Sequence, residues 1–292
     1  LIDLDLSDVH SINESITKYE PSYFINFAAQ SFVGASWSFP QQTFDVNATA
    51  LLHILESLRK HAPKCRLYNA GSSEEFGNVK YAPQDEKHPS EPRNPYAVSK
   101  CSARQFIKIY RDSFDLFAIQ CWLFNHESPR RGIEFVTRKI TNGVAKIHKA
   151  YKDKKPVEPI TLGNLNAQRD WTDARDCVRL IWDILNLRNP NEYVIGSGIS
   201  YTIKDFINPC FECIGIKGVW SGEGVNEEYI YKGDVLIKVS PEFYRPDAIN
   251  SWQDIRTADI TKAQKDLDWN LDSTLKDLAY SMVETDIKLL AS

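Results

Sequence analysis

The sequence has no long hydrophobic run. Its 292 residues contain no stretch that approaches the roughly 18 apolar residues of a membrane-spanning helix. The first residues, LIDLDLSDVH, lack the pattern of a signal peptide. These absences make a membrane an unexpected partner and favour a cytoplasmic protein.

Basic residues are not in excess either. The formal net charge is −4 at pH 7 and the pI is about 5.9. The sequence has no basic patch with interleaved aromatic residues, so nucleic acid is not an expected partner. A chain of this length can bury the core of one large domain or of two closely joined ones.

Paired cysteines are scarce. The six cysteines are scattered, and only Cys210 and Cys213, in NPCFECIGI, lie close together. A metal or redox site is one interpretation of this pair, but the sequence has no second CxxC and no nearby His to complete a zinc set. We favour buried, reduced thiols on a helix and expect no metal site.

Glycine is dispersed. The 13 glycines form no G-x-x-G-x-x-G run, the turn whose backbone amides hold a pyrophosphate in dinucleotide-binding sheets. The chain also begins with LIDLDL rather than with Met. Either the first βα units precede Leu1 in a longer protein, or a dinucleotide would be held in another way. We favour the first interpretation.

Apolar segments alternate with amphipathic ones. We expect strands at 23–29, 65–71, 116–124 and 192–198, and helices at 8–19, 47–63, 95–113, 138–151, 174–187 and twice within 261–290. Asn47 is a candidate N-cap for the second helix. Continuous apolar strands between helices are typical of a parallel sheet that is covered on both faces. We therefore predict an α/β fold, a doubly wound parallel sheet (Rossmann-like) with a smaller α/β domain interwoven through insertions, because no linker is present.

Polar residues follow the expected strands. Ligands bind at the carboxyl ends of the strands in such sheets. The resulting site candidates are Gln30, Ser31, Ser72, Glu74, Asn125, His126 and Glu127. Tyr96 and Lys100, four residues apart in NPYAVSK, share one helix face, and the ammonium favours the phenolate, so that Tyr96 can act as a base below its usual pKa. This pattern is weak evidence alone, and the Ser-x-Glu element at the end of the preceding strand strengthens it.

Seven segments carry a family resemblance. They are INFAAQSFV (25–33), YNAGSSEEFG (68–77), PRNPYAVSK (92–100), LFNHESPRRG (123–132), FVTRKIT (135–141), LGNLNAQRDW (162–171) and VSPEFYRP (239–246). On these segments the chain resembles the extended short-chain dehydrogenase/reductase family, and within it the GDP-mannose 4,6-dehydratase group, nearly end to end. The run FNHESPRRG followed by FVTRKI is the most specific part. The resemblance implies that a first strand, a glycine-rich turn, a helix and a second strand should precede Leu1.

The resemblance implies an NADP-binding domain at 1–128, 160–198 and about 240–256, and a nucleotide-sugar domain at 129–159, 199–239 and 257–292. It implies that Asp5 and Leu6 flank the adenine of the cofactor and that the strand end at 27–31 lines the dinucleotide. The other implied contacts lie near the nicotinamide and complete the cofactor site. Together these residues are Asp5, Leu6, Phe27, Ala28, Ala29, Gln30, Ser31, Tyr96, Lys100, His126 and Arg131. The implied GDP-sugar contacts are Asn125, Lys139, Arg169 and Arg245, whose cationic members suit a diphosphate.

The implied reaction is the conversion of GDP-mannose to GDP-4-keto-6-deoxymannose, a step of GDP-deoxysugar biosynthesis, with NADP as an internal hydride shuttle. Ser72 would hold the C4 oxygen, Tyr96 would remove the C4 hydroxyl proton, and Lys100 would lower the Tyr96 pKa. Glu74 would act on the proton at C5 and on the C6 hydroxyl. Ser72 departs from the Thr most common in the family, but it also supplies a hydroxyl. Ser73 stands where dTDP-glucose 4,6-dehydratases carry an Asp.

Several alternatives remain. A few extra residues follow VSPEFYRP beside Arg245, so the substrate could be another GDP-sugar, such as a GDP-manno-heptose. A nucleotide-sugar epimerase or reductase would share the fold, but epimerases generally lack an acid at the position of Glu74. A catalytically silent nucleotide-binding protein would fit the missing glycine turn, yet the catalytic set is complete. The resemblance also implies a homodimer or homotetramer.

Overall fold

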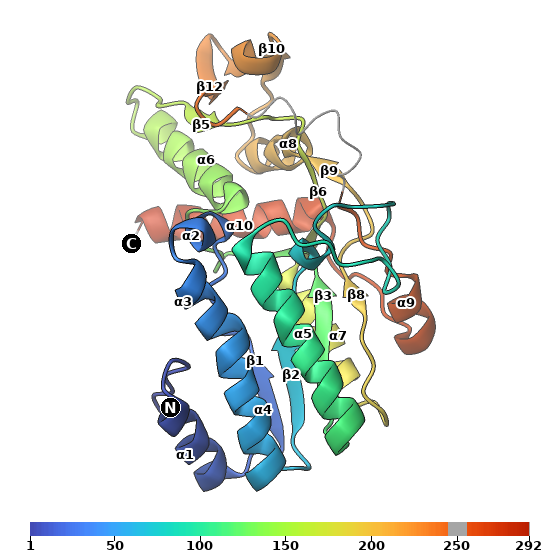
Figure 1. Cartoon of the computed structure of the whole chain (residues 1–292). Coiled ribbons are helices and arrows are strands. Elements are labelled where there is room, and N and C mark those ends of the chain that lie inside the picture. Colours follow the sequence, from blue (N-terminus) through green and yellow to red (C-terminus); the bar gives the residue numbers. More distant parts are fainter. Residues whose placement is uncertain (245–255, 292) are drawn as a thin grey trace. The chain divides into compact units, whose positions relative to one another are not determined.

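The computed structural model describes residues 1–244 and 256–291, which form two compact units (Figure 1). The first unit takes in Leu1–Phe124, Val178–Ile195 and Ala258–Trp269. The second takes in the described residues within Asn125–Cys177, Gly196–Thr257 and Asn270–Ser292. Both units therefore consist of segments that are far apart in the sequence.

The units divide the chain differently from the predicted domains. The described residues within 125–128, 160–177, 196–198 and 240–244 lie in the second unit, and Ala258–Trp269 lies in the first. Strand β4 (Asn125–Glu127) pairs with β7 (Trp171–Asp173), which keeps both strands in the second unit. In the first unit, Lys262 Nζ donates a hydrogen bond of 2.6 Å to the Glu192 carbonyl. Long-range pairing of this kind assigns each segment to its unit.

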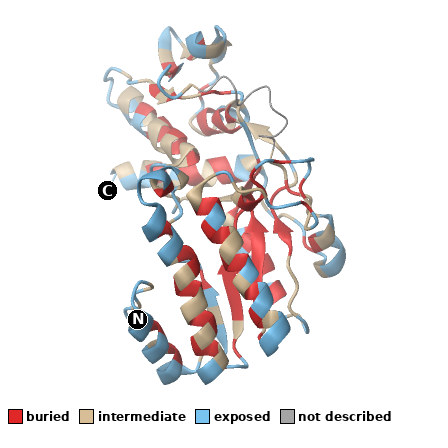
Figure 2. Cartoon of the chain, in the orientation of Figure 1, coloured by how far each residue is buried: buried red, intermediate tan, exposed pale blue. Residues whose placement is uncertain are grey.

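A parallel sheet of four strands forms the centre of the first unit, in the order β1-β2-β3-β8. The strands are β1 (Tyr23–Asn26), β2 (Arg66–Ala70), β3 (Ala118–Leu123) and β8 (Val194–Ile195). All six residues of β3 are buried, as Figure 2 shows, which fits its nearly continuous apolar sequence. The predicted parallel α/β sheet is confirmed.

Strand β1 differs from its prediction as a buried strand over 23–29. It ends at Asn26, and Tyr23 and Ile25 are exposed by 38% and 42%. Within the described residues β1 pairs only with β2. An apolar sequence shows that a strand can be buried, but its neighbours decide whether it is.

Helices α4 and α5 lie over one face of this sheet and α7 lies behind it (Figure 1). The helices of the first unit are α1 (Val9–Tyr19), α2 (Val33–Ser38), α3 (Pro40–Phe44), α4 (Ala50–His61), α5 (Pro95–Phe114) and α9 (Thr261–Leu267), and α7 (Ala174–Leu185) runs from the second unit into the first. Ile12 and Ile16 of α1 pack with Leu51, Leu55 and Leu58 of α4 in one buried cluster. The spacing of these apolar residues follows the helical period, which is why the sequence predicted both helices.

Asn47 does not cap a helix. The chain is already helical from Pro40, passes through a π-helical turn at Asp45–Thr49, and continues into α4. Asn47 is buried, and its side chain exchanges two hydrogen bonds with the backbone of Gln30: Oδ1 accepts from the amide at 2.9 Å and Nδ2 donates to the carbonyl at 3.0 Å. It therefore fixes the segment that follows β1.

The described part of the second unit has a mixed sheet and three packed helices. Its sheet order is β10-β11-β12-β5, with β12 and β5 parallel and the other pairs antiparallel. The strands are β5 (Ile160–Leu162), β10 (Val219–Ser221), β11 (Glu228–Tyr231) and β12 (Asp234–Val239), with the two-stranded pairs β4–β7 and β6 (Gln168–Arg169) with β9 (Tyr201–Thr202). The helices are α6 (Val136–Lys152), α8 (Ile203–Cys213) and α10 (Leu275–Ala291).

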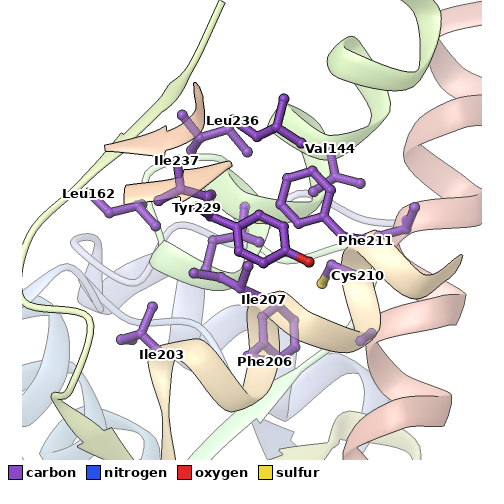
Figure 3. Close-up of a cluster of buried hydrophobic side chains, with 14 of the residues drawn as sticks. Val144, Leu162, Ile203, Phe206, Ile207, Cys210, Phe211, Tyr229, Leu236 and Ile237 are labelled. Carbon is purple, nitrogen blue, oxygen red and sulfur yellow. The ribbon is translucent and has the colours of Figure 1, made fainter. Parts of the chain in front are cut away.

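Apolar side chains from helices and sheet fill the core of the second unit (Figure 3). Phe206, Cys210 and Phe211 of α8 face Tyr229 of β11 and Ile237 of β12. Cys210 is fully buried and Cys213 is half-buried, and both are free thiols. The pair lies on a helix as free thiols, as predicted, but only Cys210 is buried.

Two classes of feature are not found in the part of the chain that the structure describes. None of its helices combines the length and the apolar character needed to cross a membrane. No group of three or more His, Cys, Asp or Glu residues is arranged to hold a metal ion among residues 1–244 and 256–291.

Candidate active site

The segment after β2 presents Ser72 and Glu74. Gly71 has no space for a side chain, since a Cβ there would lie 2.2 Å from the Cys121 carbonyl oxygen. Ser72 then caps a 3₁₀ turn at Ser73–Phe76, and its Oγ accepts a hydrogen bond from the Glu74 amide at 3.2 Å. The turn places both predicted catalytic residues directly beyond the carboxyl end of β2.

Asn94 connects this turn to the start of α5. Its Oδ1 accepts a hydrogen bond from the Ala97 amide at 2.8 Å, which caps the helix, and Pro95 occupies the first turn. Its Nδ2 donates to Glu74 Oε2 at 3.0 Å. One amide side chain thus begins the helix that carries Tyr96 and orients the Glu74 carboxylate.

Tyr96 and Lys100 lie one turn apart on α5 and are nearly buried. Lys100 Nζ is 5.8 Å from the centre of the Tyr96 ring and donates a hydrogen bond of 2.9 Å to the Ala70 carbonyl at the end of β2. Burial lowers the pKa of Lys100 to about 8, and the negative charge of Glu75 opposes part of this shift. The Lys100 ammonium therefore loses its proton in mildly alkaline solution, as the pH rises through about 8.

The structure thus gathers Ser72, Glu74, Tyr96 and Lys100 at one end of the first unit's sheet. Sequence reasoning missed Asn94 and Glu75 as part of this arrangement. Asn94 carried a signal, because Asn before Pro at a predicted helix start is a recognisable cap. Glu75 carried the signal of a capping box with Ser72, three residues before it, but its pairing with Arg104 comes from a distant segment of the chain.

The residues expected to line a dinucleotide follow β1. Phe27, Ala28 and Ser31 are exposed there. Gln30 is half-buried, and its backbone is held by Asn47. Gln30 Oε1 is buried and accepts no hydrogen bond from the described residues. An unpaired acceptor at the carboxyl end of a strand fits a ligand that donates a hydrogen bond.

Asp5 and Leu6 lie just before α1. Asp5 Oδ1 accepts hydrogen bonds from the Ser7 amide at 2.8 Å and from Ser7 Oγ at 2.7 Å, and these bonds lower the pKa of Asp5. Leu6 is half-buried against the cluster that joins α1 and α4. Asp5 is exposed, so its carboxylate is accessible to a ligand.

Other predicted site residues belong to the second unit. Asn125 Nδ2 donates to the Asp170 carbonyl at 3.2 Å, and the half-buried His126 lies beside it on β4. The Arg131 guanidinium lies 3.5 Å from the centre of the Phe135 ring. Arg131 Nε is 3.5 Å from Glu127 Oε2, an ion pair without a hydrogen bond. These contacts hold Arg131 in one orientation.

Lys139 borders a cavity of about 510 Å³ between α6 and the β5 segment. The cavity is lined by Ile133, Lys139, Asn142, Gly143, Lys146, Ile147, Ala150, Pro156, Glu158, Pro159, Ile160 and Thr161. A Cβ at Gly143 would lie 2.5 Å from the Ile160 side chain, so glycine allows α6 and β5 to pack closely. Lys139 Nζ also lies 4.9 Å from the centre of the Phe243 ring.

Arg169 and Arg245 are the two remaining predicted substrate contacts. Arg169 is exposed on β6, and its Nη1 donates to the Gln168 carbonyl at 2.6 Å. The neighbouring Asp170 is fully buried and accepts hydrogen bonds from the Ser197 amide and hydroxyl at 2.6 and 2.7 Å. Arg245 lies outside the described residues.

Comparison with known proteins places the chain in a family. The family model described as GDP-mannose 4,6 dehydratase matches residues 1–282. GDP-mannose 4,6 dehydratase 2 of Caenorhabditis elegans is 39% identical over 289 residues, which span 98% of this chain and 73% of that protein. Two solved structures share the fold: RMD from Pseudomonas aeruginosa complexed with NADPH (TM-score 0.82, 18% identity, 98% of this chain and 88% of that chain) and dTDP-glucose 4,6-dehydratase from Bacillus anthracis in complex with NAD (0.73, 18%, 98% and 79%). The chain therefore belongs to the GDP-mannose 4,6 dehydratase family.

Proposed function

We propose that this chain is a lyase that converts GDP-mannose to GDP-4-keto-6-deoxymannose. The observation that carries the proposal is the set Ser72, Glu74, Tyr96 and Lys100, gathered beyond the end of β2 in a member of this family. Glu74 distinguishes this chemistry from epimerisation, because loss of water across C5 and C6 needs an acid–base group there.

NADP is the proposed cofactor, and when bound it would take up the C4 hydride and return it at C6. The proposed contacts are those that the family resemblance implies. They are Asp5, Leu6, Phe27–Ser31, Tyr96, Lys100, His126 and Arg131. The unpaired Gln30 Oε1 supports a ligand at the β1 end. Related folds are described with NADPH and with NAD. Titration with each dinucleotide decides between them, and tighter binding of NAD would contradict the NADP proposal.

Tyr96 is the proposed base for the C4 hydroxyl proton. The Lys100 ammonium, one turn along α5, favours the phenolate and so lowers the energy needed to remove that proton. Ser72 follows the end of β2, where Lys100 binds the Ala70 carbonyl, and its hydroxyl is proposed to hydrogen-bond the C4 oxygen as alcohol and as ketone. Both Tyr96 and Ser72 are nearly buried, which strengthens these polar contacts.

Glu74 is the proposed acid–base group at C5 and C6. Oxidation at C4 acidifies the C5 hydrogen, so a carboxylate can remove that proton and then assist departure of the C6 hydroxyl as water. The half-buried Glu74 is accessible, and Asn94 holds one of its oxygens. In net terms C4 is oxidised, C6 is reduced, and the sugar loses one water.

The cavity beside Lys139 is the proposed site of the nucleotide part of the substrate. Lys139 and Lys146 supply positive charge for phosphate oxygens, and Glu158 supplies an acceptor for the N1 and N2 hydrogens of guanine. Asn125, Arg169 and Arg245 stay proposed substrate contacts on the strength of the family resemblance. The cavity chemistry fits a GDP-sugar.

Incubation of the full-length protein with GDP-mannose and NADP tests the function. We expect a product lighter by one water in the mass spectrum. The Glu74→Gln variant should lower kcat by about 100-fold or more while it still binds GDP. Parental turnover in Glu74→Gln would contradict the assignment of Glu74. Loss of water from another GDP-sugar but not from GDP-mannose would keep the reaction and change the substrate.

We also propose that the chain acts in the cytoplasm as a homodimer or homotetramer. All six cysteines are free, as is usual in a reducing compartment. Val98, Ile109 and Phe114 on α5 are exposed by 43%, 52% and 47%, and apolar residues on one helix are typical of an oligomer contact. Light scattering of the purified protein would give the subunit number, and a monomer at micromolar concentration would contradict the proposal.

A further inference from the structure

Glu75 is a fully buried carboxylate next to the proposed acid–base residue Glu74. The chemistry proposed above does not use it. Its Oε1 accepts a hydrogen bond from the Ser72 amide at 2.8 Å, which completes the capping of the 3₁₀ turn. Its Oε2 accepts from Arg104 Nε at 2.7 Å. The Glu75 carboxylate thus connects the 3₁₀ turn, through the Ser72 amide, to α5, through Arg104.

Arg104 compensates the buried charge of Glu75. It projects from α5 one turn beyond Lys100 and is only 6% exposed. Its Nη1 donates to the Gln120 carbonyl at 2.6 Å and to Glu192 Oε2 at 3.2 Å, and its guanidinium lies 3.5 Å from the centre of the Trp122 ring. The three guanidinium nitrogens all donate hydrogen bonds, so the pair has one defined geometry.

A row of buried amides crosses the sheet and ends on Glu75. Asn26, Asn69 and Gln120 are register partners on β1, β2 and β3. Asn26 Nδ2 donates to Asn69 Oδ1 at 2.8 Å, and Asn69 Nδ2 donates to Gln120 Oε1 at 2.7 Å. Gln120 Nε2 then donates to Glu75 Oε1 at 3.2 Å and to the Lys100 carbonyl at 2.9 Å. All these donors point the same way, toward the carboxylate.

This network reaches the catalytic groups through the backbone. Glu75 holds the amide of Ser72, and the turn between them carries Glu74. Gln120 joins Glu75 to Lys100 at the same time. A buried ion pair is weak evidence for stability, because apolar residues of similar volume often serve as well. The contact of Glu75 with the Ser72 amide instead indicates a role in positioning the catalytic residues.

We propose that Glu75 is a positioning residue for the dehydration, which holds the Ser72–Glu74 turn against α5 through the Ser72 amide, Arg104 and Gln120. This inference rests on the proposed function. Positioning requires the full length of the side chain. Glu75→Asp keeps the charge beside Arg104, but its carboxylate is one methylene shorter and cannot hold both Arg104 and the Ser72 amide.

The matched control is Glu192→Gln. It removes the other carboxylate on the same arginine but has no contact with the catalytic turn. With GDP-mannose and NADP, Glu75→Asp should lower kcat by about tenfold or more with KM changed less than about twofold, because misplaced groups slow the chemical step. Glu192→Gln should keep kcat and KM within about twofold of the parent. If Glu75→Asp does not fold, Glu75→Gln replaces it; Gln keeps the length but has a single acceptor oxygen for the Ser72 amide and Arg104, so we expect a similar loss.

Parental kcat in either folded Glu75 variant, or an equal loss in Glu192→Gln, would overturn the inference. Amide hydrogen exchange of segment 70–77, read by mass spectrometry, needs no turnover. Faster exchange in the Glu75 variant than in Glu192→Gln supports positioning, and equal exchange contradicts it. If the parental chain does not dehydrate GDP-mannose, the proposed function fails, and the exchange result alone decides the role of Glu75.

Discussion

At the scale of single residues, the buried Lys100 ammonium dominates the electrostatics of the site. Water is excluded from it, which lowers its pKa to about 8, and Glu75 partly offsets that cost. Tyr96 depends on this positive charge to ionise. The charge state of Lys100 therefore couples pH to both catalysis and stability.

The pH dependence of kcat is expected to follow Lys100. As the pH rises through about 8, the ammonium loses its proton and Tyr96 loses the charge that favours its phenolate, so kcat should fall. Lys100→Met should lower kcat at every pH and remove this alkaline decline. A pH–rate profile from 6 to about 10 measures both. A parental kcat that stays constant up to pH 10 would contradict the role of Lys100.

The stability effect of Lys100 has a definite sign. Its pKa in the folded state, about 8, lies below the usual value of 10.5, so between these values the unfolded chain binds more protons. The contribution of Lys100 to the free energy of unfolding therefore rises as the pH increases across this window. Denaturant unfolding measures this effect. From pH 8 to pH 10.5 the free energy of unfolding of the parent should rise relative to that of Lys100→Met. A constant difference would contradict the lowered pKa.

Gly71 is a second residue at which the structure allows a sharp test. A methyl group there would meet the Cys121 carbonyl at 2.2 Å, so β2 or β3 would have to shift. Gly71→Ala should lower the free energy of unfolding by about 1–3 kcal/mol. Gly132→Ala is the control, because its methyl group would meet only the carboxyl end of Glu134. Equal thermal stability of the two variants would contradict this packing argument.

At the scale of elements, the start of α5 combines two tasks. Asn94 caps the helix through the Ala97 amide and binds Glu74 through its other side-chain atom. A cap normally affects only stability. Here it also orients a proposed catalytic carboxylate, so the two effects can be separated by the choice of substitution.

Asn94→Asp and Asn94→Ala should differ in stability but not in catalysis. Asp keeps the cap, so the free energy of unfolding should stay near the parental value, whereas Ala should cost about 1 kcal/mol. Both variants lose the donor to Glu74, and Asp also places a like charge beside it, so both should lower kcat. Thermal unfolding and turnover assays measure the two effects. Full activity in Asn94→Asp would show that this contact is dispensable.

At the scale of the whole molecule, the residues proposed for chemistry lie in the first unit and the Lys139 cavity lies in the second. Contacts to the nucleotide part of a substrate act about equally in the ground state and in the transition state. Changes in the cavity should therefore affect binding, whereas changes beyond β2 should affect the chemical step.

Lys139→Met tests this division of roles. It keeps the length of the side chain but removes the charge proposed for the diphosphate, so KM for GDP-mannose should rise by about tenfold with kcat little changed. Lys149→Met is a control on the same helix, because Lys149 is exposed and does not line the cavity. Calorimetric titration with GDP gives the same comparison without turnover. Unchanged GDP affinity in Lys139→Met would contradict the assignment of the cavity.

Much of the local structure could be predicted from the sequence. The helical period marked α1, α4, α5, α6, α7 and α10, and continuous apolar runs marked β2 and β3. The four-residue spacing of Tyr96 and Lys100 fixed them on one helix face. These features depend on neighbours within a turn or a strand, which the order of residues specifies directly.

What the sequence alone determined was therefore the α/β fold and most of the elements, and it also supplied the proposed catalytic set. Only the tertiary structure decided that Asn47 holds Gln30 and that Glu75 is paired with Arg104. Asn47 lies 17 residues from Gln30 and Glu75 lies 29 from Arg104. Local periodicity reaches only a few residues. At longer separations, burial and hydrogen-bond partners depend on which segments the folded chain brings together.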